Sequence, residues 1–383
     1  MTLTLISNNT GLNQETLYII AGLYIFAWLF QIIHYLYILG AFNRFRQPEL
    51  SSAFPPVSVV ICAKNEAENL KKFLPSVLEQ DYPEFQVVVV NDTSTDDTEM
   101  VLSEMREKYK NLYYTSIPVD KKFFHGKKLA LTLGIKAAKH EHLVLTDADC
   151  YPVSDKWLRQ MAGSLNDTKK IVLGYGAYEK HKGLLNLMIR FETFWNAVQY
   201  FGFALTIRPF MGVGRNMAYE KELFTNGSQF RNNLTVASGD DDLFIIEAGN
   251  KKNTTINASP ESHTMSVPPK TFKELRLQKA RHLTSSAHYP ILIKTWLFFE
   301  NFTRQIFWFL TICSIIFSIF APIAGAIFAV LIFTKLMVLG KAAKKLQQKQ
   351  LFWALLLFDW LIPIWVGILW ISNLLRPKRI KWK

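Results

Sequence analysis

Cysteine is scarce in this sequence of 383 residues, which contains only three. Cys62, Cys150 and Cys313 lie far apart in apolar or strand-like surroundings, with no CxxC pair and no Cys/His cluster. This pattern argues against a disulfide framework and against a structural zinc site. We therefore expect reduced cysteines and a soluble part that faces a reducing compartment.

Acidic residues are also in short supply, because 31 Asp and Glu stand against 44 Lys and Arg, giving a net charge of +13. A basic chain suits nucleic acid, anionic lipid or a phosphate-bearing substrate. The basic residues form no continuous stripe and match no nucleic-acid-binding motif, so no nucleic-acid partner is expected. Their positions beside apolar segments favour a membrane surface instead.

Charge is absent from residues 17–39, which contain no Asp, Glu, Lys or Arg. Their 23 residues exceed the roughly 20 that are needed to span a bilayer. Residues 1–16 lack the basic start of a cleaved signal peptide, so we predict a retained transmembrane helix. Because Arg44 and Arg46 follow it, residues 1–16 are expected outside and the next segment in the cytoplasm.

A second apolar region, residues 305–339, carries almost no charge and contains Pro322 and Gly325. Proline and glycine interrupt helices. The region therefore predicts a tight hairpin of two short transmembrane helices, 305–321 and 322–340.

The last apolar segment, residues 351–375, lies between the basic stretch 341–350 and the basic tail 376–383. A single crossing would put the tail outside, against the positive-inside rule. A bend at Pro363 would return it to the cytoplasm. The segment is therefore either a transmembrane helix or re-entrant, and we favour four spans in the whole chain.

Residues 50–265 have the pattern of an α/β domain, in which short β-branched runs alternate with helical segments. The expected strands are 57–63, 86–92, 111–117 and 142–149, and the expected helices are 65–80, 98–110 and 127–139. This alternation predicts a mostly parallel sheet with helices on both faces. Ligands of such sheets bind beyond the carboxyl ends of the strands.

Two further helical segments follow from the pattern of apolar residues. Residues 184–205 are apolar and aromatic but are interrupted by Arg190 and Glu192. They are either a core helix or a helix at the membrane interface beside an acceptor site. Residues 266–290 are basic and amphipathic, which predicts a second interfacial helix.

Carboxylates stand at two of the predicted strand ends. Asp92 follows one strand and could accept hydrogen bonds from a base or ribose, or could simply cap the next helix. Asp147 and Asp149 follow another strand, where alternate carboxylates can reach one hard cation such as Mg²⁺ or Mn²⁺. A departing diphosphate requires such charge neutralisation.

Three successive carboxylates, Asp240, Asp241 and Asp242, repel one another unless they are solvated or bound to a cation. Crowding raises the pKa of at least one of them, which suits a general base. The alternative is a solvated acidic helix start.

Basic groups offer partners for phosphate. Gln278 and Arg281 are three residues apart and share a helix face, and Arg281 could grip a diphosphate with two hydrogen bonds. Lys127 stands at an expected helix start. The alternative for both sites is an ordinary solvated basic surface.

Taken in order, these features resemble the inverting family 2 glycosyltransferases, the group that contains cellulose synthase and ceramide glucosyltransferase. The resemblance covers about residues 55–285 and rests on these motifs: VSVVICAKNEAENL, VVNDTSTDDT, HGKKLAL, TDAD, GVGRNMAY, SGDDD and QKARH. It implies a GT-A fold, a nucleotide-sugar donor, typically a UDP-sugar, and Mg²⁺ or Mn²⁺.

The resemblance also implies roles for residues on the donor side. Asp92 matches the residue that contacts the nucleoside, with Ala63 and Glu66 nearby. Lys127 matches a residue that approaches the diphosphate, and Asp147 one that contacts the nucleotide.

Further roles concern the metal and the reaction. Asp149, with Asp147, matches the metal ligands. Asp241 matches the catalytic Asp of the family's Glu-Asp pair, and Asp240 matches the Glu. Asp242 is an alternative position for that base, on the acceptor side.

Gln278 and Arg281 match the family's Gln-x-x-Arg-Trp motif, but His282 replaces the Trp that stacks on the acceptor sugar in polymerising members. The membrane part is also smaller than in polymerising members that export their product. Both departures favour a single transfer onto a membrane lipid or lipid-linked acceptor by an integral membrane enzyme with a cytoplasmic catalytic domain.

Other functions remain open at this point. A processive polysaccharide synthase of the same family would make a ladder of products. A membrane nucleotidyltransferase could use the same acidic pair but leaves QKARH unexplained. A scaffold or transporter subunit needs none of these motifs, and the few charges within the apolar segments, Lys335 and Asp359, argue against a transport path.

Overall fold

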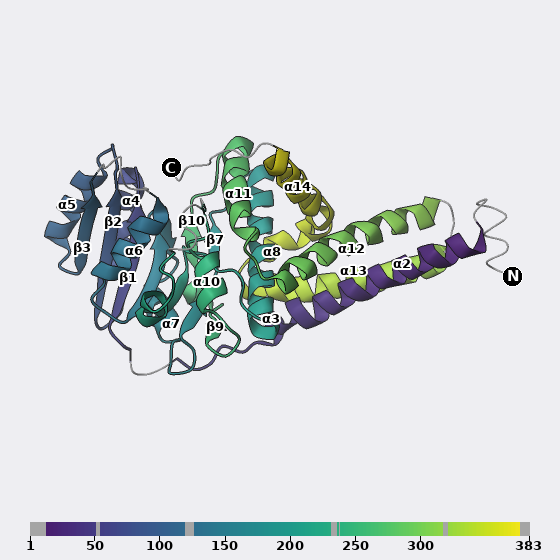
Figure 1. Cartoon of the computed structure of the whole chain (residues 1–383), viewed down its shortest axis with the longest axis horizontal. Helices are drawn as coiled ribbons and strands as arrows, with labels where there is room; N and C mark the ends of the chain where they lie inside the picture. The colour runs from purple at the N-terminus through teal and green to yellow at the C-terminus, as the bar shows by residue number, and fades with distance from the viewer. Residues whose placement is uncertain are drawn as a thin grey trace.

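The computed structural model describes residues 13–50, 54–118, 126–230, 236, 238–316 and 321–375. Most of the predicted N-terminal segment and the whole basic tail 376–383 lie outside these residues. An α/β domain occupies one end of the molecule, and an arm of long helices extends from its other side (Figure 1).

The α/β domain is built on a seven-stranded sheet with the order β3-β2-β1-β4-β8-β6-β9. The strands are β1 Val57–Ala63, β2 Phe85–Asp92, β3 Leu112–Ile117, β4 His142–Asp147, β6 Ile171–Leu173, β8 Met217–Glu220 and β9 Thr254–Ile256. The first four pair in parallel, whereas β8 runs antiparallel between β4 and β6. The mostly parallel sheet predicted from the sequence is confirmed.

Helices cover both faces of this sheet, because its central strands are apolar on both sides. α4 Ala67–Leu78, α5 Thr98–Lys108 and α7 Trp157–Ala162 pack on the face that carries Val59 and Val87. α6 Lys127–Ala137 packs on the opposite face, against Val60 and Val90, together with the long helix α8 Leu184–Thr206.

A second, three-stranded sheet lies at the carboxyl edge of the first. Its strands are β5 Cys150–Pro152, β10 Thr264–Ser266 and β7 Gly176–Tyr178, with β10 in the middle. The remaining short helices of the domain are α9 Lys221–Thr225, α10 Asp242–Ala248 and η3 Pro260–Ser262. The expected strand 142–149 therefore ends at Asp147, and the chain turns before β5.

Three long helices form the arm. α2 Gln14–Ile33 continues through a π-helical turn, η1 His34–Leu39, into α3 Gly40–Arg44. It packs along α12 Ile291–Ile316 and α13 Ala321–Lys345 (Figure 1). Tyr24 of α2 stacks on Phe307 of α12 at 5.1 Å between ring centroids.

The expected hairpin of spans 305–321 and 322–340 is wrong in its boundaries. α12 already begins at Ile291, and α13 runs on to Lys345. Pro322 is the second residue of α13, where a missing N–H costs nothing, so it does not break a helix. The basic stretch is partly helical because lysine is a good helix former.

The segment 351–375 is a short helical turn, η4 Lys349–Ala354, followed by the continuous helix α14 Leu355–Leu375. Pro363 lies inside α14 without ending it. α14 packs against α11 Phe272–Ser286, α12 and α8. α11 is the expected amphipathic helix within 266–290.

α8 connects the two parts of the molecule. Its residues are buried on all sides, as in a core helix, and it contacts η1, α3, α14 and the sheet strand β9. Gly202 of α8 lies where a Cβ would come within 2.5 Å of the carbonyl oxygen of Ile38. This close approach of two helix backbones requires a residue without a side chain.

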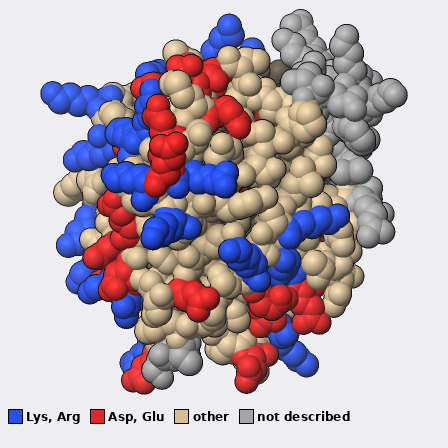
Figure 2. All heavy atoms as spheres, turned by 90° about the vertical axis from the view of Figure 1, so that its left-hand side faces the viewer, with Lys and Arg blue, Asp and Glu red and all other residues tan. Residues whose placement is uncertain are grey.

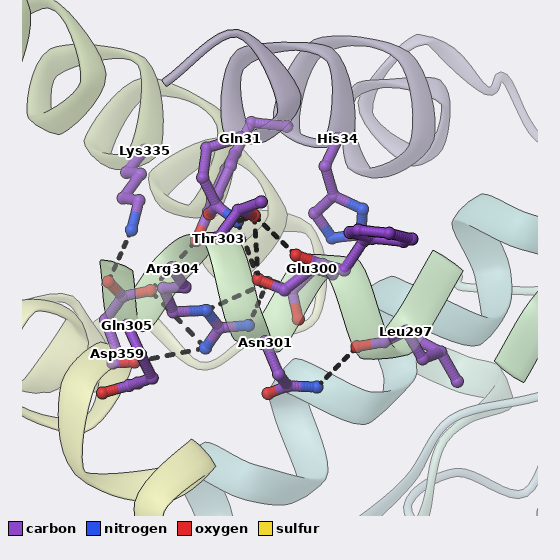
Figure 3. Close-up of polar contacts among 12 residues, drawn as sticks. Gln31, His34, Leu297, Glu300, Asn301, Thr303, Arg304, Gln305, Lys335 and Asp359 are labelled. Atoms are coloured by element: carbon purple, nitrogen blue, oxygen red, sulfur yellow. Dashed lines mark hydrogen bonds and ion pairs between the residues drawn. The ribbon is translucent and has the colours of Figure 1, made fainter. Parts of the chain in front are cut away.

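Buried charges join the arm to α14 (Figure 3). Lys335 Nζ lies 2.5 Å from Asp359 Oδ2, and Arg304 donates to Glu300 and to the carbonyl oxygen of Asp359. Tyr35 also donates to Asp359, at 3.1 Å. Each of the three helices α12, α13 and α14 therefore contributes to one paired network.

The described residues include three helical segments that are long and apolar enough to cross a membrane: Gln14–Arg44, Ala321–Lys345 and Lys349–Ser372. They indicate a membrane protein. In the same described part of the chain, α12 does not meet this criterion, and it carries the charges of Lys294, Glu300 and Arg304. The sequence pattern favours four spans, one more than the three segments that meet this criterion among the described residues.

Charge is mixed on the end of the α/β domain that lies farthest from the arm. Figure 2 shows Lys and Arg side chains interspersed with Asp and Glu over this face. The net positive charge of the chain is therefore not concentrated there.

The contact between Gly202 and Ile38 provides a test of how α8 holds the arm. Gly202→Ala should lower the free energy of unfolding by about 1–3 kcal/mol, because the new methyl group forces the two helices apart. Gly22→Ala is the matched control, since no atom lies within 4 Å of its Cβ position. Thermal unfolding in detergent measures both, and an equal melting temperature for Gly202→Ala and wild type would contradict the close approach.

Candidate active site

A polar cavity lies at the carboxyl ends of β1 and β4, between the large sheet, the small sheet and α11. The residues predicted from the sequence that line it are Glu66, Lys127, Asp147, Asp149, Asp240, Asp241, Gln278, Arg281 and His282. We call it the polar cavity. It brings together residues that are more than 200 positions apart in the chain.

Lys127 lies at the centre of the acidic groups. Its Nζ is 2.9 Å from Asp147 Oδ1 and 2.9 Å from Asp240 Oδ2. Burial alone would lower the pKa of Lys127, but Asp147, Asp240 and Asp241 together hold it well above its usual 10.5. Burial likewise opposes ionisation of Asp240, and the Lys127 ammonium outweighs it, so the pKa of Asp240 is lowered.

Asp241 is held by backbone groups. Its Oδ2 accepts from the N–H of Gly214 at 2.9 Å, and its Oδ1 accepts from the N–H of Asp242 at 2.8 Å. Burial, followed by the negative charge of Asp240, raises the pKa of Asp241 above 3.8. The crowding expected from three successive carboxylates is therefore present.

Asp242 has a different environment from its two neighbours. Its Oδ2 accepts from the hydroxyls of Ser285 and Tyr289, both at 2.8 Å. Its Oδ1 is buried and has no hydrogen-bond partner in the described part of the chain. Burial and the charge of Asp241 raise the pKa of Asp242 well above its ordinary value.

A possible acidic metal site is formed by Asp147, Asp149 and Cys150, whose ligand atoms lie within 4.8 Å of one another. The two partly exposed carboxylates line the polar cavity, whereas Cys150 is buried and its Sγ lies 2.8 Å from the Ser266 hydroxyl. Hard divalent cations prefer oxygen, and Mg²⁺ needs only one or two carboxylates beside substrate phosphates. The donor set therefore fits Mg²⁺ or Mn²⁺ through Asp147 and Asp149.

Two residues of the polar cavity had received no role from the sequence. The Tyr178 hydroxyl accepts from Gln278 Nε2 at 2.9 Å and from Arg215 Nη1 at 3.1 Å. Arg215 also donates to the carbonyl oxygen of Gly176. Arg215 lies within the GVGRN stretch, so its charge was a visible signal, but Tyr178 had none.

Two predicted residues lie outside this cavity. Asp92 and Ala63 are fully buried and do not line it among the residues described. Asp92 lies 3.8 Å from Lys64 at the neighbouring strand end. The structure thus separates these two positions from the remaining donor-side candidates.

A second, mainly apolar cavity adjoins the first, and we call it the helix-lined cavity. Four helices contribute one stripe each: Glu192, Trp195, Asn196 and Gln199 from α8; Lys279, His282, Leu283, Ser285 and Ser286 from α11; Leu297, Asn301 and Arg304 from α12; Ile362, Pro363, Val366 and Leu369 from α14. Residues three, four and seven positions apart share a helix face, which explains the stripes.

The two cavities meet at a few shared residues. Asp241 and His282 line both, together with Val213 and Ser238. Burial, followed by nearby cationic side chains, lowers the pKa of His282 well below 6.5, so its ring is neutral. Asp242 lines only the helix-lined cavity among the cavities described.

Known proteins resemble this chain in sequence. The family described as Glycosyl transferase family 2 matches residues 58–226. Poly-beta-1,6-N-acetyl-D-glucosamine synthase of Staphylococcus epidermidis is 31% identical over 124 residues, 32% of this chain and 29% of that protein. Beta-monoglucosyldiacylglycerol synthase of a Nostoc species is 28% identical over 177 residues, 46% of this chain and 36% of that protein. The chain thus spans only about a third of the length of these relatives.

A solved structure resembles the fold over nearly the whole chain. It is a mannosyltransferase of Pyrobaculum calidifontis in complex with GDP-Man and Mn²⁺. The similarity has a TM-score of 0.54 at 18% identity and covers 90% of this chain and 98% of that one. The α/β domain therefore has the GT-A fold that the sequence motifs led us to expect.

The position of Lys127 between carboxylates gives a prediction on stability. Lys127→Met should lower the free energy of unfolding by about 2–3 kcal/mol, because Asp147 and Asp240 lose their shared counter-ion. The loss is smaller than for a fully buried pair, since the Lys127 side chain is 22% exposed.

The control is Lys170→Met, which breaks the more exposed pair with Glu220 and should lower the free energy of unfolding by less than Lys127→Met does. Chemical unfolding of the detergent-solubilised protein measures both. The double variant Lys127→Met/Asp240→Asn should recover part of the loss, and a strictly additive double variant would show that the two side chains do not interact.

Proposed function

We propose that this chain, because it contains a glycosyl transferase family 2 domain, is a metal-dependent inverting glycosyltransferase. It moves a sugar from a nucleotide-diphosphate-sugar, most simply a UDP-sugar, to a membrane lipid or lipid-linked acceptor. The observation that carries this proposal is that the polar cavity, which is lined by Lys and Arg side chains, meets the mainly apolar helix-lined cavity at Asp241.

The polar cavity suits the donor. Lys127, Arg215 and Arg281 supply positive charge around it, and Gln278 supplies an amide. Arg281 is the cation best suited to a diphosphate, because Lys127 is already engaged by carboxylates and Arg215 by Gly176 and Tyr178. Glu66, Asp92 and Ala63 remain candidates for the nucleoside side, although two of them are buried behind the cavity wall.

The helix-lined cavity suits the acceptor. Its far wall is α14, which contributes only apolar residues, and α14 belongs to a segment apolar enough to cross a membrane. A lipid acceptor can therefore lie with its tail against α14 and its headgroup toward Asp241 and Asp242. His282 lies between donor and acceptor.

The reaction is a single displacement with inversion. Asp241 takes the proton from the acceptor hydroxyl, whose oxygen forms a bond to the anomeric carbon as the bond to the diphosphate breaks. Two backbone N–H groups hold the Asp241 carboxylate, and its raised pKa suits a proton acceptor. Asp240 acts indirectly, by orienting Lys127 and by raising the pKa of Asp241.

Asp149 and Asp147 are the residues that would hold Mg²⁺ or Mn²⁺. A bound divalent cation supplies neutralisation of the charge that develops on the departing diphosphate. Arg281 adds positive charge at the same place. Positioning both reactants at one junction contributes further, because it removes the entropic cost of an encounter.

The orientation in the membrane follows from the basic residues at the domain end of the arm. Arg44 ends α3 and Arg46 follows it, while Lys341 and Lys344 lie near the end of α13 and Lys349 begins η4. By the positive-inside rule this end, and with it the catalytic domain, faces the cytoplasm. Donor nucleotide-sugars would then be taken from that side.

A processive polysaccharide synthase of the same family is the second candidate. One relative named above is such a synthase, but the helix-lined cavity favours a single lipid acceptor because α14 closes it with apolar residues. Product length separates the two functions: one added sugar, or a ladder.

A donor screen tests the proposed function. The full chain in phosphatidylcholine vesicles with Mn²⁺ or Mg²⁺ should release nucleoside diphosphate from one of a panel of nucleotide-sugars, and release should increase with added lipid extract. Chelation by EDTA should abolish it. Asp149→Ala and Asp241→Asn should each reduce turnover by at least about 10²–10⁴-fold while the protein stays folded. Near-normal turnover in either variant would remove that residue from its role.

The pH profile tests the environment of Asp241. The proton-accepting form is the carboxylate, so activity should fall as the pH drops through the raised pKa of Asp241. The acid limb of kcat/KM should thus lie above the range of an ordinary aspartate. Asp240→Asn should shift this limb to lower pH, because it removes the neighbouring negative charge. A limb that moves to higher pH would contradict this assignment.

A further inference from the structure

The polar groups on the wall of the helix-lined cavity indicate which kind of acceptor headgroup it can bind. Two carboxylate oxygens on its wall, Glu192 Oε2 and Asp242 Oδ1, are buried and have no hydrogen-bond partner among the residues that the structure describes. Glu192 is 4% exposed and Asp242 6%. A buried carboxylate oxygen without a partner is costly, so this cavity is built to receive hydrogen-bond donors.

The cations of this cavity are already paired. Among the described residues on its wall they are Lys279 and Arg304. Lys279 Nζ lies 2.8 Å from Glu192 Oε1. Arg304 is bound by Glu300 and Asp359 (Figure 3). Its guanidinium also lies 4.5 Å from the Trp195 ring centre.

Among its described residues, the wall therefore has no cation without an ion-pair partner. Lys279 is engaged by Glu192, and Arg304 is engaged by Glu300 and Asp359. A phosphate ester offers hydrogen-bond acceptors and negative charge, and it would find no available cation on this wall to compensate that charge. Phosphate-binding sites use unengaged Arg or Lys side chains, as Arg281 offers on the donor side.

The neutral polar side chains of the helix-lined cavity also favour an uncharged headgroup that donates hydrogen bonds. Asn196, Gln199 and Asn301 line the cavity, on the same helix stripes as Glu192 and Arg304. The side-chain N–H of Asn301 already donates to the carbonyl oxygen of Leu297, at 2.8 Å. Amides and carboxylates on apolar walls are typical of sites that recognise hydroxyl and amide groups.

We propose that the acceptor is a lipid with an uncharged headgroup that offers at least two hydrogen-bond donors, one at Asp241 and Asp242 and another at Glu192. This inference rests on the proposed glycosyl transfer and names its acceptor class. The reacting hydroxyl lies at Asp241, and the second donor binds Glu192 Oε2. Glu192 is then a specificity-determining residue, and Lys279 positions it.

The test uses the full chain in phosphatidylcholine vesicles with the metal and the donor that the screen selects. Four acceptors are compared at equal mole fraction: ceramide, a monoglucosyl diacylglycerol, diacylglycerol with its single hydroxyl, and undecaprenyl phosphate. We expect transfer to ceramide or to the monoglucosyl lipid to exceed transfer to diacylglycerol about tenfold. Undecaprenyl phosphate should not be glycosylated. If undecaprenyl phosphate is the best of the four acceptors, or if diacylglycerol equals both multi-donor lipids, the inference is overturned.

A variant tests whether Glu192 causes the preference for acceptors with two or more hydrogen-bond donors. Glu192→Gln should raise KM for the neutral acceptor about tenfold, the factor that corresponds to about 1.4 kcal/mol, while kcat and the KM of the donor change less than about twofold. Glu192→Asp should restore part of the affinity. Glu220→Gln is the matched control, since Glu220 is also paired with a lysine, Lys170, but lies outside the cavity. An unchanged acceptor KM in Glu192→Gln would also overturn the inference.

Hydrolysis of the donor in the absence of lipid separates this inference from the proposed function. Wild type and Glu192→Gln should release nucleoside diphosphate to water at equal low rates, which also shows that the variant is folded. If no donor is cleaved with or without lipid, the glycosyltransferase proposal itself fails, and the acceptor class fails with it. Cleavage that occurs only with the phosphate lipid contradicts the acceptor class alone.

Discussion

The contact on which the site depends is the pair of 2.9 Å bonds from Lys127 to Asp147 and Asp240. Asp147 ends the central strand β4, whereas Asp240 belongs to the turn before α10, so one ammonium group ties the sheet edge to the acceptor side. Without the Lys127 ammonium, the carboxylates that line the polar cavity would repel one another in a partly buried space. These are Asp147, Asp149, Asp240 and Asp241. Lys127 therefore allows Asp240 to stay ionised beside Asp241, and that charge is one of the two causes of the raised pKa of Asp241.

A second constraint is that α8 belongs to both halves of the molecule. One of its sides packs under the sheet, and the close approach at Gly202 fixes it against the first helix of the arm. The stripe of Glu192 and Gln199 on the same helix lines the helix-lined cavity. The relative position of the arm and the α/β domain thus sets the geometry of that cavity, because α8 links the first helix of the arm to residues of the cavity wall.

The sequence predicted those elements that a short stretch of neighbouring residues determines. The Val-rich strands β1 and β2 and the carboxylates at the end of β4 were found because a buried strand and its polar end have a clear pattern. From the sequence, residues 184–205 stayed open as a core helix or a helix beside an acceptor site, and Glu192 had no role because this residue looked like an interruption of an apolar helix. Likewise Lys335 and Asp359 looked like isolated charges, and only the packing of α13 on α14 pairs them at 2.5 Å. Asp92 stays a prediction for the nucleoside side, because its strand-end position was clear from the sequence whereas its burial outside the polar cavity was not.

The division of charge between the two cavities explains how one site could hold a charged donor and an uncharged acceptor side by side. The polar cavity keeps an arginine for a diphosphate, whereas the helix-lined cavity pairs each described cation with a carboxylate and leaves two carboxylate oxygens without partners. A charged donor is therefore disfavoured in the acceptor space, and an uncharged headgroup gains little in the donor space. Asp241 lies where the two environments meet, so in the proposed mechanism the group that takes the proton is within reach of both reactants.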